Sequence, residues 1–432
     1  HEKLPSKRSF AKNLGISVIT VENAYEQLMA EGYIYSIPKK GFYVADLREL
    51  NLTKTLSVSP SSTLLSFKEK VPYLADFTSN QTDSEIFPFT IWARTMRELL
   101  NENQQQLMEN PPCGGIMALR QAIADYLHAF RGMVVNPEQI IVGAGTEYLY
   151  GLLIQLLGDD KIYGIENPGY PKIAKIYDSM HVSYSAIDLD EHGVCIYSLE
   201  DHQIDIMHLS PSHHFPTGII TPISRRYELL GWASKDENRY IIEDDYDSEF
   251  RYKGKPIPAL QGYDIHERVI YLGTFSRSIA PALRMSYMVL PESLLCVYER
   301  EYRFINSTVS KIDQKIVERF LAEGYYERHL NRMRALYKSR HDTLLNALKP
   351  LLSIGSVSGE YAGVHLLFTF HDGRSEEDAV KKAKQGGIQI YGLSTFETQK
   401  MQRSCTILLG FANLPEEEIR AGAALLAEKL LE

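Results

Sequence analysis

Two segments of the sequence carry residue types that bind phosphate. Gly143-Ala144-Gly145-Thr146 follows an apolar run and opens a predicted helix, so backbone amides and the Thr146 hydroxyl would form an anion site there. Farther along, Thr274, Ser276 and Arg284 offer two hydroxyls and a guanidinium that could grip the same phosphate. A glycine-rich turn taken alone is more simply an ordinary structural turn.

Two other positions suit a flat ring with a basic nitrogen. Tyr170 follows a predicted strand, and its ring could stack on another ring. Asp244 belongs to a run of carboxylates at the end of the next strand, where a carboxylate keeps a pyridinium nitrogen protonated. Core packing of Tyr170 and a solvated acidic loop at Asp244 are the simpler alternatives.

Alternating strands and helices must position these residues. Apolar runs predict buried strands at 140–143, 162–165, 204–209, 240–243 and 269–272. Helical stretches such as 145–157 lie between them, which predicts an α/β architecture with a largely parallel sheet. A long helix at about 311–348 is expected to lead into a smaller C-terminal α+β domain at about 335–432.

The N-terminal residues predict a different kind of unit. Helices are expected at 6–14, with Phe10, Ala11 and Leu14 as the apolar face, and at about 18–30. A short turn with a glycine joins them, as in a helix-turn-helix. A β-hairpin follows with a basic tip.

This geometry predicts a DNA-binding surface. The second helix would present Ser17, Thr20 and Asn23 to the major groove. Phosphate contacts are expected from Arg8, Lys39 and Lys40. A small helical cap with a solvated hairpin is the alternative that the pattern alone leaves open.

Length and charge fit this division. The chain has 432 residues, which suggests two or three domains, and we expect a DNA-binding domain at 1–48, a linker at 49–70 and a larger domain at 71–432. Residues 1–48 hold seven Lys or Arg against five Asp or Glu, on a chain whose net charge is −9. A slightly basic module on an acidic body is thereby indicated.

Other features favour a cytoplasmic protein. We find no apolar run long enough for a transmembrane helix and no signal peptide at the N-terminus. The four cysteines are far apart, which fits a reducing compartment. His213 and His214 are adjacent on a predicted loop without other ligands near them, so no metal site is expected.

The motifs resemble a known family over nearly the whole chain. Leu4-Pro5-Ser6-Lys7-Arg8 and Glu31-Gly32-Tyr33-Ile34 resemble the winged helix of GntR-type bacterial regulators, beginning at its second helix, so the domain here is partial. The phosphate and ring motifs, joined by Ser210-Pro211-Ser212-His213-His214-Phe215-Pro216-Thr217-Gly218, resemble fold-type I aminotransferases. Together they resemble the MocR/GabR group, which fuses a winged helix to an aminotransferase-like domain that binds pyridoxal 5′-phosphate (PLP), typically as a head-to-tail homodimer.

The resemblance implies a role for each matching position. Asp244 would hold the pyridine nitrogen, Tyr246 the ring hydroxyl, and Tyr170 would stack on the ring. The phosphate contacts that the resemblance implies are Gly145, Thr146, Thr274, Ser276 and Arg284.

Arg277 departs from this pattern, because the family has its Schiff-base lysine there. A guanidinium stays protonated and cannot form the Schiff base, so transamination should be abolished while non-covalent PLP binding remains possible. The arginine is either natural to this position or a replacement of the lysine.

A second departure concerns the effector. The segment at 406–412 has leucine where aminotransferases have the arginine that binds a substrate carboxylate. Lys172 and Arg403 are candidate substitutes, with ordinary surface charges as the alternative for both.

These observations predict a transcriptional regulator that binds promoter DNA and senses an amine-containing or vitamin B6 effector through the aminotransferase-like domain. Effector and DNA affinities would then be reciprocally linked. One alternative is an active aminotransferase with an accessory DNA-binding domain, against which Arg277 argues. Another is a regulator that senses PLP itself, which the missing arginine slightly favours.

Overall fold

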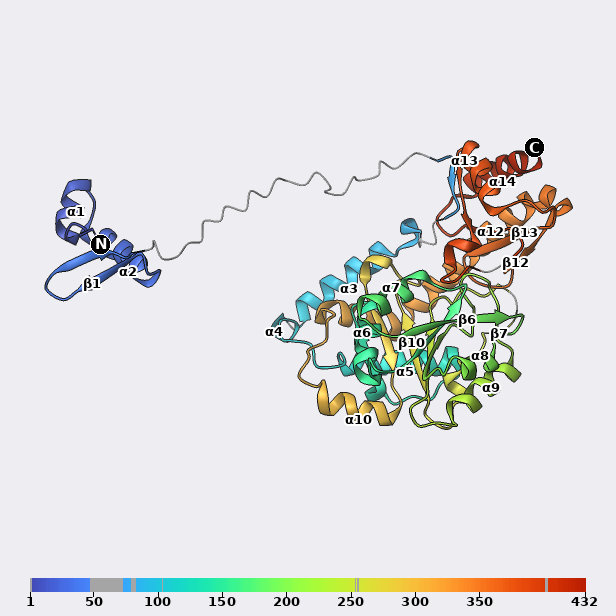
Figure 1. The fold of residues 1–432 in the computed structure, drawn as a ribbon, viewed down its shortest axis with the longest axis horizontal. Helices are drawn as coiled ribbons and strands as arrows, with labels where there is room; N and C mark the ends of the chain where they lie inside the picture. The colour runs from blue at the N-terminus through green and yellow to red at the C-terminus, as the bar shows by residue number, and fades with distance from the viewer. Residues whose placement is uncertain are drawn as a thin grey trace. The chain divides into compact units, whose positions relative to one another are not determined.

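The protein is described by a computed structural model that divides into two compact units, His1–Lys70 and Val71–Glu432 (Figure 1). The described residues are 2–46, 73–78, 83–102, 104–252, 254, 256–400 and 403–432. The predicted linker at 49–70 lies outside them. Within these ranges, no helix has the length and apolar character needed to cross a membrane.

The N-terminal unit contains two helices and a hairpin, as predicted. The elements are α1 (Lys7–Leu14), α2 (Val18–Ala30), β1 (Ile34–Ile37) and β2 (Gly41–Val44), and the two strands pair antiparallel. Ser6 and Ser17 cap the helices by accepting hydrogen bonds from Ser9 N (3.2 Å) and Thr20 N (3.1 Å). These caps satisfy backbone amides that the first turn of a helix leaves without partners.

A small apolar core holds this unit together. Ala11, Val21, Tyr25 and Ile34 are buried, and the Tyr25 hydroxyl donates to the Pro5 carbonyl at 3.0 Å. Leu14, which was predicted to lie on the apolar face of this helix, is not part of the core, and its side chain is 54% exposed. It is the last residue of α1, directly before Gly15 in the turn.

An eight-stranded sheet forms the centre of the second unit, in the order β4-β11-β10-β9-β8-β5-β6-β7. Strands β10, β9, β8, β5 and β6 run parallel, whereas β11 is antiparallel to both neighbours and β7 is antiparallel to β6. The largely parallel sheet is therefore confirmed. The strands are β4 (Ile140–Gly143), β5 (Tyr163–Asn167), β6 (Tyr184–Asp190), β7 (Gly193–Val194), β8 (Ile206–Leu209), β9 (Tyr240–Asp245), β10 (Val269–Thr274) and β11 (Ser286–Val289).

Helices cover both faces of this sheet. One apolar cluster joins α6, α7 and α10 to one set of strand residues, and another joins α5, α11 and α12 to residues that alternate with them. Because neighbouring strand residues point to opposite faces, both faces are buried. The helices are α3 (Phe89–Glu102), α4 (Gln104–Leu107), α5 (Met117–Arg131), α6 (Thr146–Leu157), α7 (Pro171–Ser179), α8 (Ile196–Asp201), α9 (Ile223–Ala233), α10 (Glu292–Glu301), α11 (Lys311–Ala322) and α12 (Tyr325–Ala347).

The prediction of a single helix at 311–348 is wrong. The structure has two helices there, α11 and α12, separated at Gly324. Gly324 adopts φ +70°, which is outside the helical region and costs a glycine little. The apolar pattern on both sides continues across this break, so periodicity alone did not reveal it.

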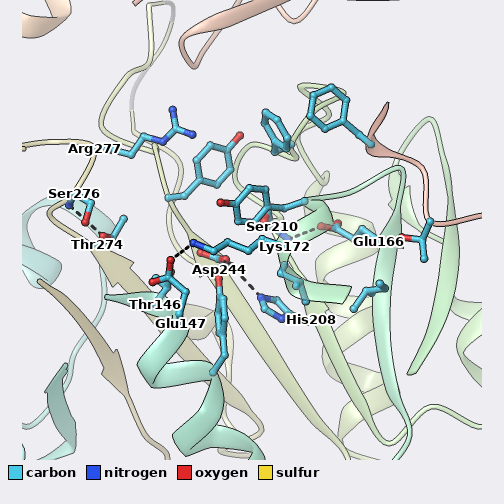
Figure 2. Close-up of a pocket in the computed structure, with 18 of the residues that line it drawn as sticks. Thr146, Glu147, Glu166, Lys172, His208, Ser210, Asp244, Thr274, Ser276 and Arg277 are labelled. Atoms are coloured by element: carbon cyan, nitrogen blue, oxygen red, sulfur yellow. Dashed lines mark hydrogen bonds and ion pairs between the residues drawn. The ribbon is translucent and has the colours of Figure 1, made fainter. Parts of the chain in front are cut away.

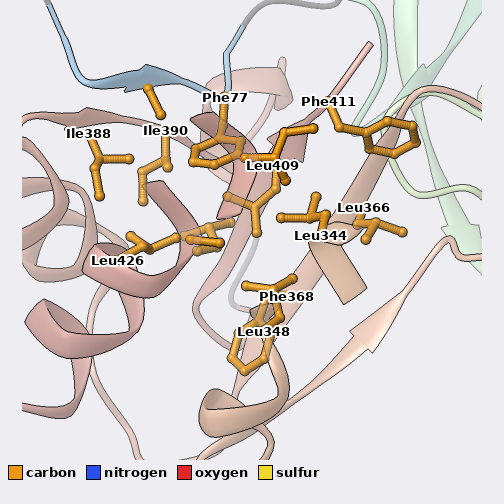
Figure 3. Close-up of a cluster of buried hydrophobic side chains, with 14 of the residues drawn as sticks. Phe77, Leu344, Leu348, Leu366, Phe368, Ile388, Ile390, Leu409, Phe411 and Leu426 are labelled. Carbon is orange, nitrogen blue, oxygen red and sulfur yellow. The ribbon is translucent and has the colours of Figure 1, made fainter. Parts of the chain in front are cut away.

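A smaller region follows α12. An antiparallel sheet has the order β12 (Gly355–Ser358), β13 (His365–Phe370), β16 (Thr406–Gly410) and β15 (Tyr391–Gly392). Helices α13 (Glu376–Gln385) and α14 (Glu416–Leu431) accompany it, and β14 (Ile388–Gln389) pairs with β3 (Ala75–Asp76). Figure 3 shows the apolar core of this region, in which Leu366, Leu409 and Phe411 pack together.

Parallel strands bring several chain segments to one edge of the large sheet. The carboxyl ends of β5, β8, β9 and β10 meet there, beside the N-terminus of α6. In open α/β sheets this edge is where ligands bind.

Candidate functional site

A cavity of about 400 Å³ opens at this edge (Figure 2). Most of its lining comes from the carboxyl ends of the parallel strands and the loops that follow them. A smaller part comes from the C-terminal region. The lining residues are Thr78, Thr146, Glu147, Tyr150, Ile165, Glu166, Tyr170, Lys172, Ile173, His208, Ser210, Phe215, Asp244, Tyr246, Thr274, Ser276, Arg277, Arg284, Tyr391, Phe396 and Thr398.

The N-terminus of α6 forms a cradle for an anion. Gly145 immediately precedes the helix with φ +92°, and a Cβ there would lie 2.4 Å from Arg284 Nη2. Only glycine therefore lets the Arg284 guanidinium approach the start of the helix. Thr146 adds its hydroxyl at the first helical position, so the cradle combines amides, a hydroxyl and a cation.

Glu147 forms ion pairs with the two cationic side chains at this end of the cavity. Its two carboxylate oxygens form ion pairs with Lys172 Nζ and Arg284 Nη2. Burial alone would raise the pKa of Glu147, but the hydrogen bonds from Lys172 and Arg284 outweigh it and lower the pKa to about 2. Glu147 therefore stays ionised and holds Lys172 and Arg284 at the cavity.

Asp244 lies at the bottom of the cavity, near the end of β9. It accepts a hydrogen bond from the Tyr150 hydroxyl at 2.5 Å, and His208 Nε2 lies 3.5 Å from the same oxygen. The Tyr177 hydroxyl is 3.1 Å from His208 Nδ1 on the other side of the ring. Burial and the charge of Asp244 raise the pKa of Tyr150 well above its usual range, so Tyr150 remains a donor that fixes the carboxylate.

Tyr246 and Arg277 face each other across another part of the lining. The Arg277 guanidinium carbon lies 5.4 Å from the centre of the Tyr246 ring. The Tyr246 hydroxyl is 3.1 Å from His213 Nδ1, and that nitrogen is 2.9 Å from Asp247. Burial and the Asp247 charge raise the pKa of Tyr246, which therefore stays a neutral phenol.

The segment after β10 is fixed by its own hydroxyls. Ser276 N donates to Thr274 Oγ1 at 3.1 Å, and Ser286 Oγ donates to the same atom at 2.8 Å. Ser278 Oγ accepts a hydrogen bond from the Tyr326 hydroxyl at 2.8 Å. These bonds hold Arg277 on a rigid loop.

An aromatic cluster closes the opposite side. The centre of the Phe215 ring lies 5.1 Å from the ring centre of Phe396, 6.1 Å from that of Tyr170 and 6.2 Å from that of Tyr246. Tyr391 packs edge-on against Phe396 at 5.8 Å. This side offers apolar surface and ring edges rather than charge.

The sequence did not identify several polar groups of the lining, among them Tyr150, His208 and Glu166. Tyr150 and His208 were taken as parts of apolar helix and strand patterns, although both contact Asp244. Glu166 accepts a hydrogen bond from Ser210 N at 3.0 Å, and burial raises its pKa well above the usual range. A polar residue inside a buried strand or helix was the signal that could have revealed all three.

The predicted residues of the cofactor site come together in space. Those that line the cavity are Thr146, Tyr170, Asp244, Tyr246, Thr274, Ser276, Arg277 and Arg284, with Gly145 at the cradle. Of the two candidate effector contacts, Lys172 is in the lining. Arg403 is not, and its guanidinium lies 3.8 Å from Glu397 Oε1 and 3.5 Å from the Asn167 carbonyl.

The C-terminal strand β16 sends no cation into the cavity. Leu408 and Leu409 are both fully buried, Leu409 in the core of the C-terminal region and Leu408 beside Phe396. Among the described residues, no group of three or more His, Cys, Asp or Glu is arranged to hold a metal ion.

The residues predicted to contact DNA lie on the surface of the N-terminal unit. All six are exposed, and Ser17 and Thr20 are also hydrogen-bonded to each other at 2.8 Å. Their contacts with DNA stay a prediction. The six are Arg8, Ser17, Thr20, Asn23, Lys39 and Lys40.

Comparisons with known families match both units. The family model for aminotransferase class I and II matches residues 74–425, and the model for bacterial regulatory proteins of the gntR family matches residues 1–44. The solved structure of a multiple substrate aminotransferase from Thermococcus profundus superposes with a TM-score of 0.73 at 23% identity, covering 84% of this chain and 92% of that one. This likeness shows the fold.

Curated relatives match most of the chain. The uncharacterized HTH-type transcriptional regulator YdeL of Bacillus subtilis is 39% identical, over 97% of this chain and 90% of its own length. The probable rhizopine catabolism regulatory protein MocR of Rhizobium meliloti is 30% identical, over 97% and 87%. The HTH-type pyridoxine biosynthesis transcriptional regulator PdxR of Corynebacterium glutamicum is 32% identical, over 81% and 75%.

Proposed function

The chain belongs to the bacterial regulators that join a gntR-type DNA-binding domain to an aminotransferase class I and II domain, and we propose that its aminotransferase-like unit binds PLP and an effector to control promoter binding. The observation that carries the proposal is one cavity with an anion cradle at Gly145 and a fixed carboxylate at Asp244. A protein that acts on promoter DNA would work in the cytoplasm.

The residues of the cavity fit PLP. Thr146, Thr274, Ser276 and Arg284 would hold the phosphate, and the glycine at 145 leaves the room that this requires. When bound, PLP would supply an aldehyde on an electron-poor ring. Asp244, fixed by Tyr150, would keep the ring nitrogen protonated, while the neutral Tyr246 would donate to the ring hydroxyl and Tyr170 would cover one face.

We propose a sensing role rather than catalysis. By its resemblance to the family motif, Arg277 would stand at the position of the Schiff-base lysine, and a guanidinium cannot lose a proton to become a nucleophile. Its guanidinium is directed over the Tyr246 ring. The aminotransferase fold would then serve as a receptor whose ligand state is transmitted to the DNA-binding unit, most simply in a head-to-tail homodimer.

The effector would be an amine-containing compound or a form of vitamin B6. Lys172 and Arg403 are the candidate contacts for an anionic group, and the lining position of Lys172 supports it more strongly than Arg403. A second candidate is a regulator that senses PLP itself. The buried leucines of β16 favour it, because they offer no cation for the carboxylate of an amino acid.

Two measurements test the proposal. Equilibrium dialysis should show PLP binding to the chain, and Arg277→Lys should attach PLP covalently at position 277, which borohydride makes permanent. DNA from upstream of the native gene should bind the chain in a PLP-dependent manner, and Asn23→Ala should weaken this binding by about 1–3 kcal/mol. If neither the chain nor Arg277→Lys binds PLP, the cofactor assignment is wrong.

A further inference from the structure

Lys172 is the one lysine among the described residues that line the cavity. Resting on the proposed PLP site, we propose that Lys172 takes over the covalent role that Arg277 cannot perform, and binds the aldehyde of PLP through its amine. The cofactor would then be tethered from α7 instead of from the loop after β10.

The position of Lys172 supports this assignment. It is the second residue of α7, two positions beyond Tyr170, which caps that helix and lies on the cavity wall. Figure 2 shows its side chain reaching to Glu147, with which Nζ forms an ion pair. The other Glu147 oxygen binds Arg284, so Nζ lies at the phosphate end of the cavity.

The chemistry of the PLP ring places its aldehyde in the same half of the cavity. The aldehyde carbon is attached opposite the ring nitrogen and next to the carbon that carries the phosphate arm. With the nitrogen at Asp244 and the phosphate at Thr146 and Arg284, the aldehyde would be directed away from Asp244 and toward the phosphate end of the cavity. A lysine on a flexible four-carbon stem can reach it from Glu147.

The reaction needs no further reagent. The Lys172 side chain is 47% exposed, so the proton that its ammonium must release would pass to solvent. The amine nitrogen would then bond to the aldehyde carbon, and the carbonyl oxygen would leave as water with the two amine hydrogens, so that a C=N bond replaces the C=O bond. Holding both groups in one cavity raises their effective concentration far above that in solution.

This tether defines the class of effector. A primary amine that enters the cavity would compete with Lys172 for the aldehyde carbon, and its success would release the side chain to Glu147. The aromatic cluster around Phe215 and Phe396 would favour amines with an apolar body.

Borohydride trapping tests the assignment. The chain is mixed with one equivalent of PLP, reduced, digested and mapped by mass spectrometry, while equilibrium dialysis measures total PLP binding in parallel. We expect the label on Lys172, and Lys172→Arg should reduce trapping at least tenfold while total binding changes only a few-fold. Lys175→Arg is the matched control, since Lys175 is exposed on the same helix and is not in the lining.

The outcomes are distinguishable. If PLP binds in dialysis but borohydride traps it on no residue, or equally on Lys175, the tether through Lys172 is wrong and the proposed function stands. Loss of all PLP binding would overturn both. In Arg277→Lys, movement of the label from Lys172 to position 277 would support the view that the two residues serve one aldehyde.

Discussion

The two sides of the cavity differ in how they can recognise a ligand. The side built by the large sheet carries an ordered set of charges, with Glu147 between Lys172 and Arg284 and with Asp244 fixed by Tyr150. The lining that the described residues of the C-terminal region contribute is neutral, and consists of Tyr391, Phe396 and Thr398.

This difference follows from the two sheets. Strands of the parallel sheet end at the cavity, so the polar residues after their last buried positions meet there. Strand β16 instead packs both of its faces into apolar clusters, which leaves Leu408 and Leu409 buried. One side can therefore fix a phosphorylated ring by charge, whereas the other can select only by shape and apolar contact.

Leu409→Arg gives the strongest test of the neutral side, because it places a cation on β16. Leu409 is fully buried among Leu366 and Phe411, so the arginine would be a buried charge without a partner. We expect the free energy of unfolding to fall by more than about 4 kcal/mol. Urea denaturation followed by circular dichroism measures the loss.

Leu409→Met is the control for this experiment, and it should cost less than about 1.5 kcal/mol. A stable Leu409→Arg protein that binds amino acid carboxylates would contradict the proposed division, because β16 would then face the cavity.

His365 tests the same region through pH. It lies on β13, its Nε2 donates a hydrogen bond to the Pro216 carbonyl at 2.8 Å, and its ring packs against Phe215. Burial, aided by the charge of His213, lowers its pKa to about 4. In the unfolded chain this histidine takes up a proton near pH 6.5. The stability that the neutral His365 contributes is therefore complete above that pH and is lost as the pH falls toward 4.

We therefore expect the difference in unfolding free energy between the parent and His365→Gln to shrink by about 2 kcal/mol between pH 6.5 and pH 5. Urea denaturation at several pH values measures it. A constant difference would mean that His365 takes up a proton as readily in the folded protein as in the unfolded chain, so that this side of the cavity does not exclude charge.

The sequence predicted the fold well where burial is continuous. The strands of the large sheet that are buried on both faces appear as apolar runs, so β4, β5, β8, β9 and β10 were predicted. Strands β6, β7 and β11 were not predicted, and the break at Gly324 was missed because one glycine hardly disturbs a helical pattern.

For the candidate site, the sequence predicted which residues gather there but not the contacts between them. Motif order predicted a set of cofactor residues that the structure brings together at one cavity, and most of them follow a strand end or open a helix. The ion pairs of Glu147 with Lys172 and Arg284 join residues far apart in the sequence, and depend on how α6, α7 and the loop before β11 pack. No local pattern encodes such contacts, and the role of Tyr150 under Asp244 was missed for the same reason.

Arg284→Gln tests the charged side. The change removes a charged donor from the phosphate cradle and leaves Glu147 with Lys172 alone. We expect PLP to bind about 30- to 100-fold more weakly, as for the loss of hydrogen bonds to a charged group. Equilibrium dialysis measures the change in PLP affinity. Arg300→Gln is the control, because the Arg300 side chain is 70% exposed on α10, and it should leave PLP binding unaltered.

The smallest expected effect comes from the neutral side. Phe396→Leu keeps an apolar side chain in place of a ring that packs 5.1 Å from Phe215. If charge fixes PLP and the neutral side serves only the effector, PLP affinity should change by less than about threefold, or 0.7 kcal/mol. A loss as large as that of Arg284→Gln would show that Phe396 supports the cofactor itself. The two sides would then act as one site, and amines with an apolar body would have no separate place to bind.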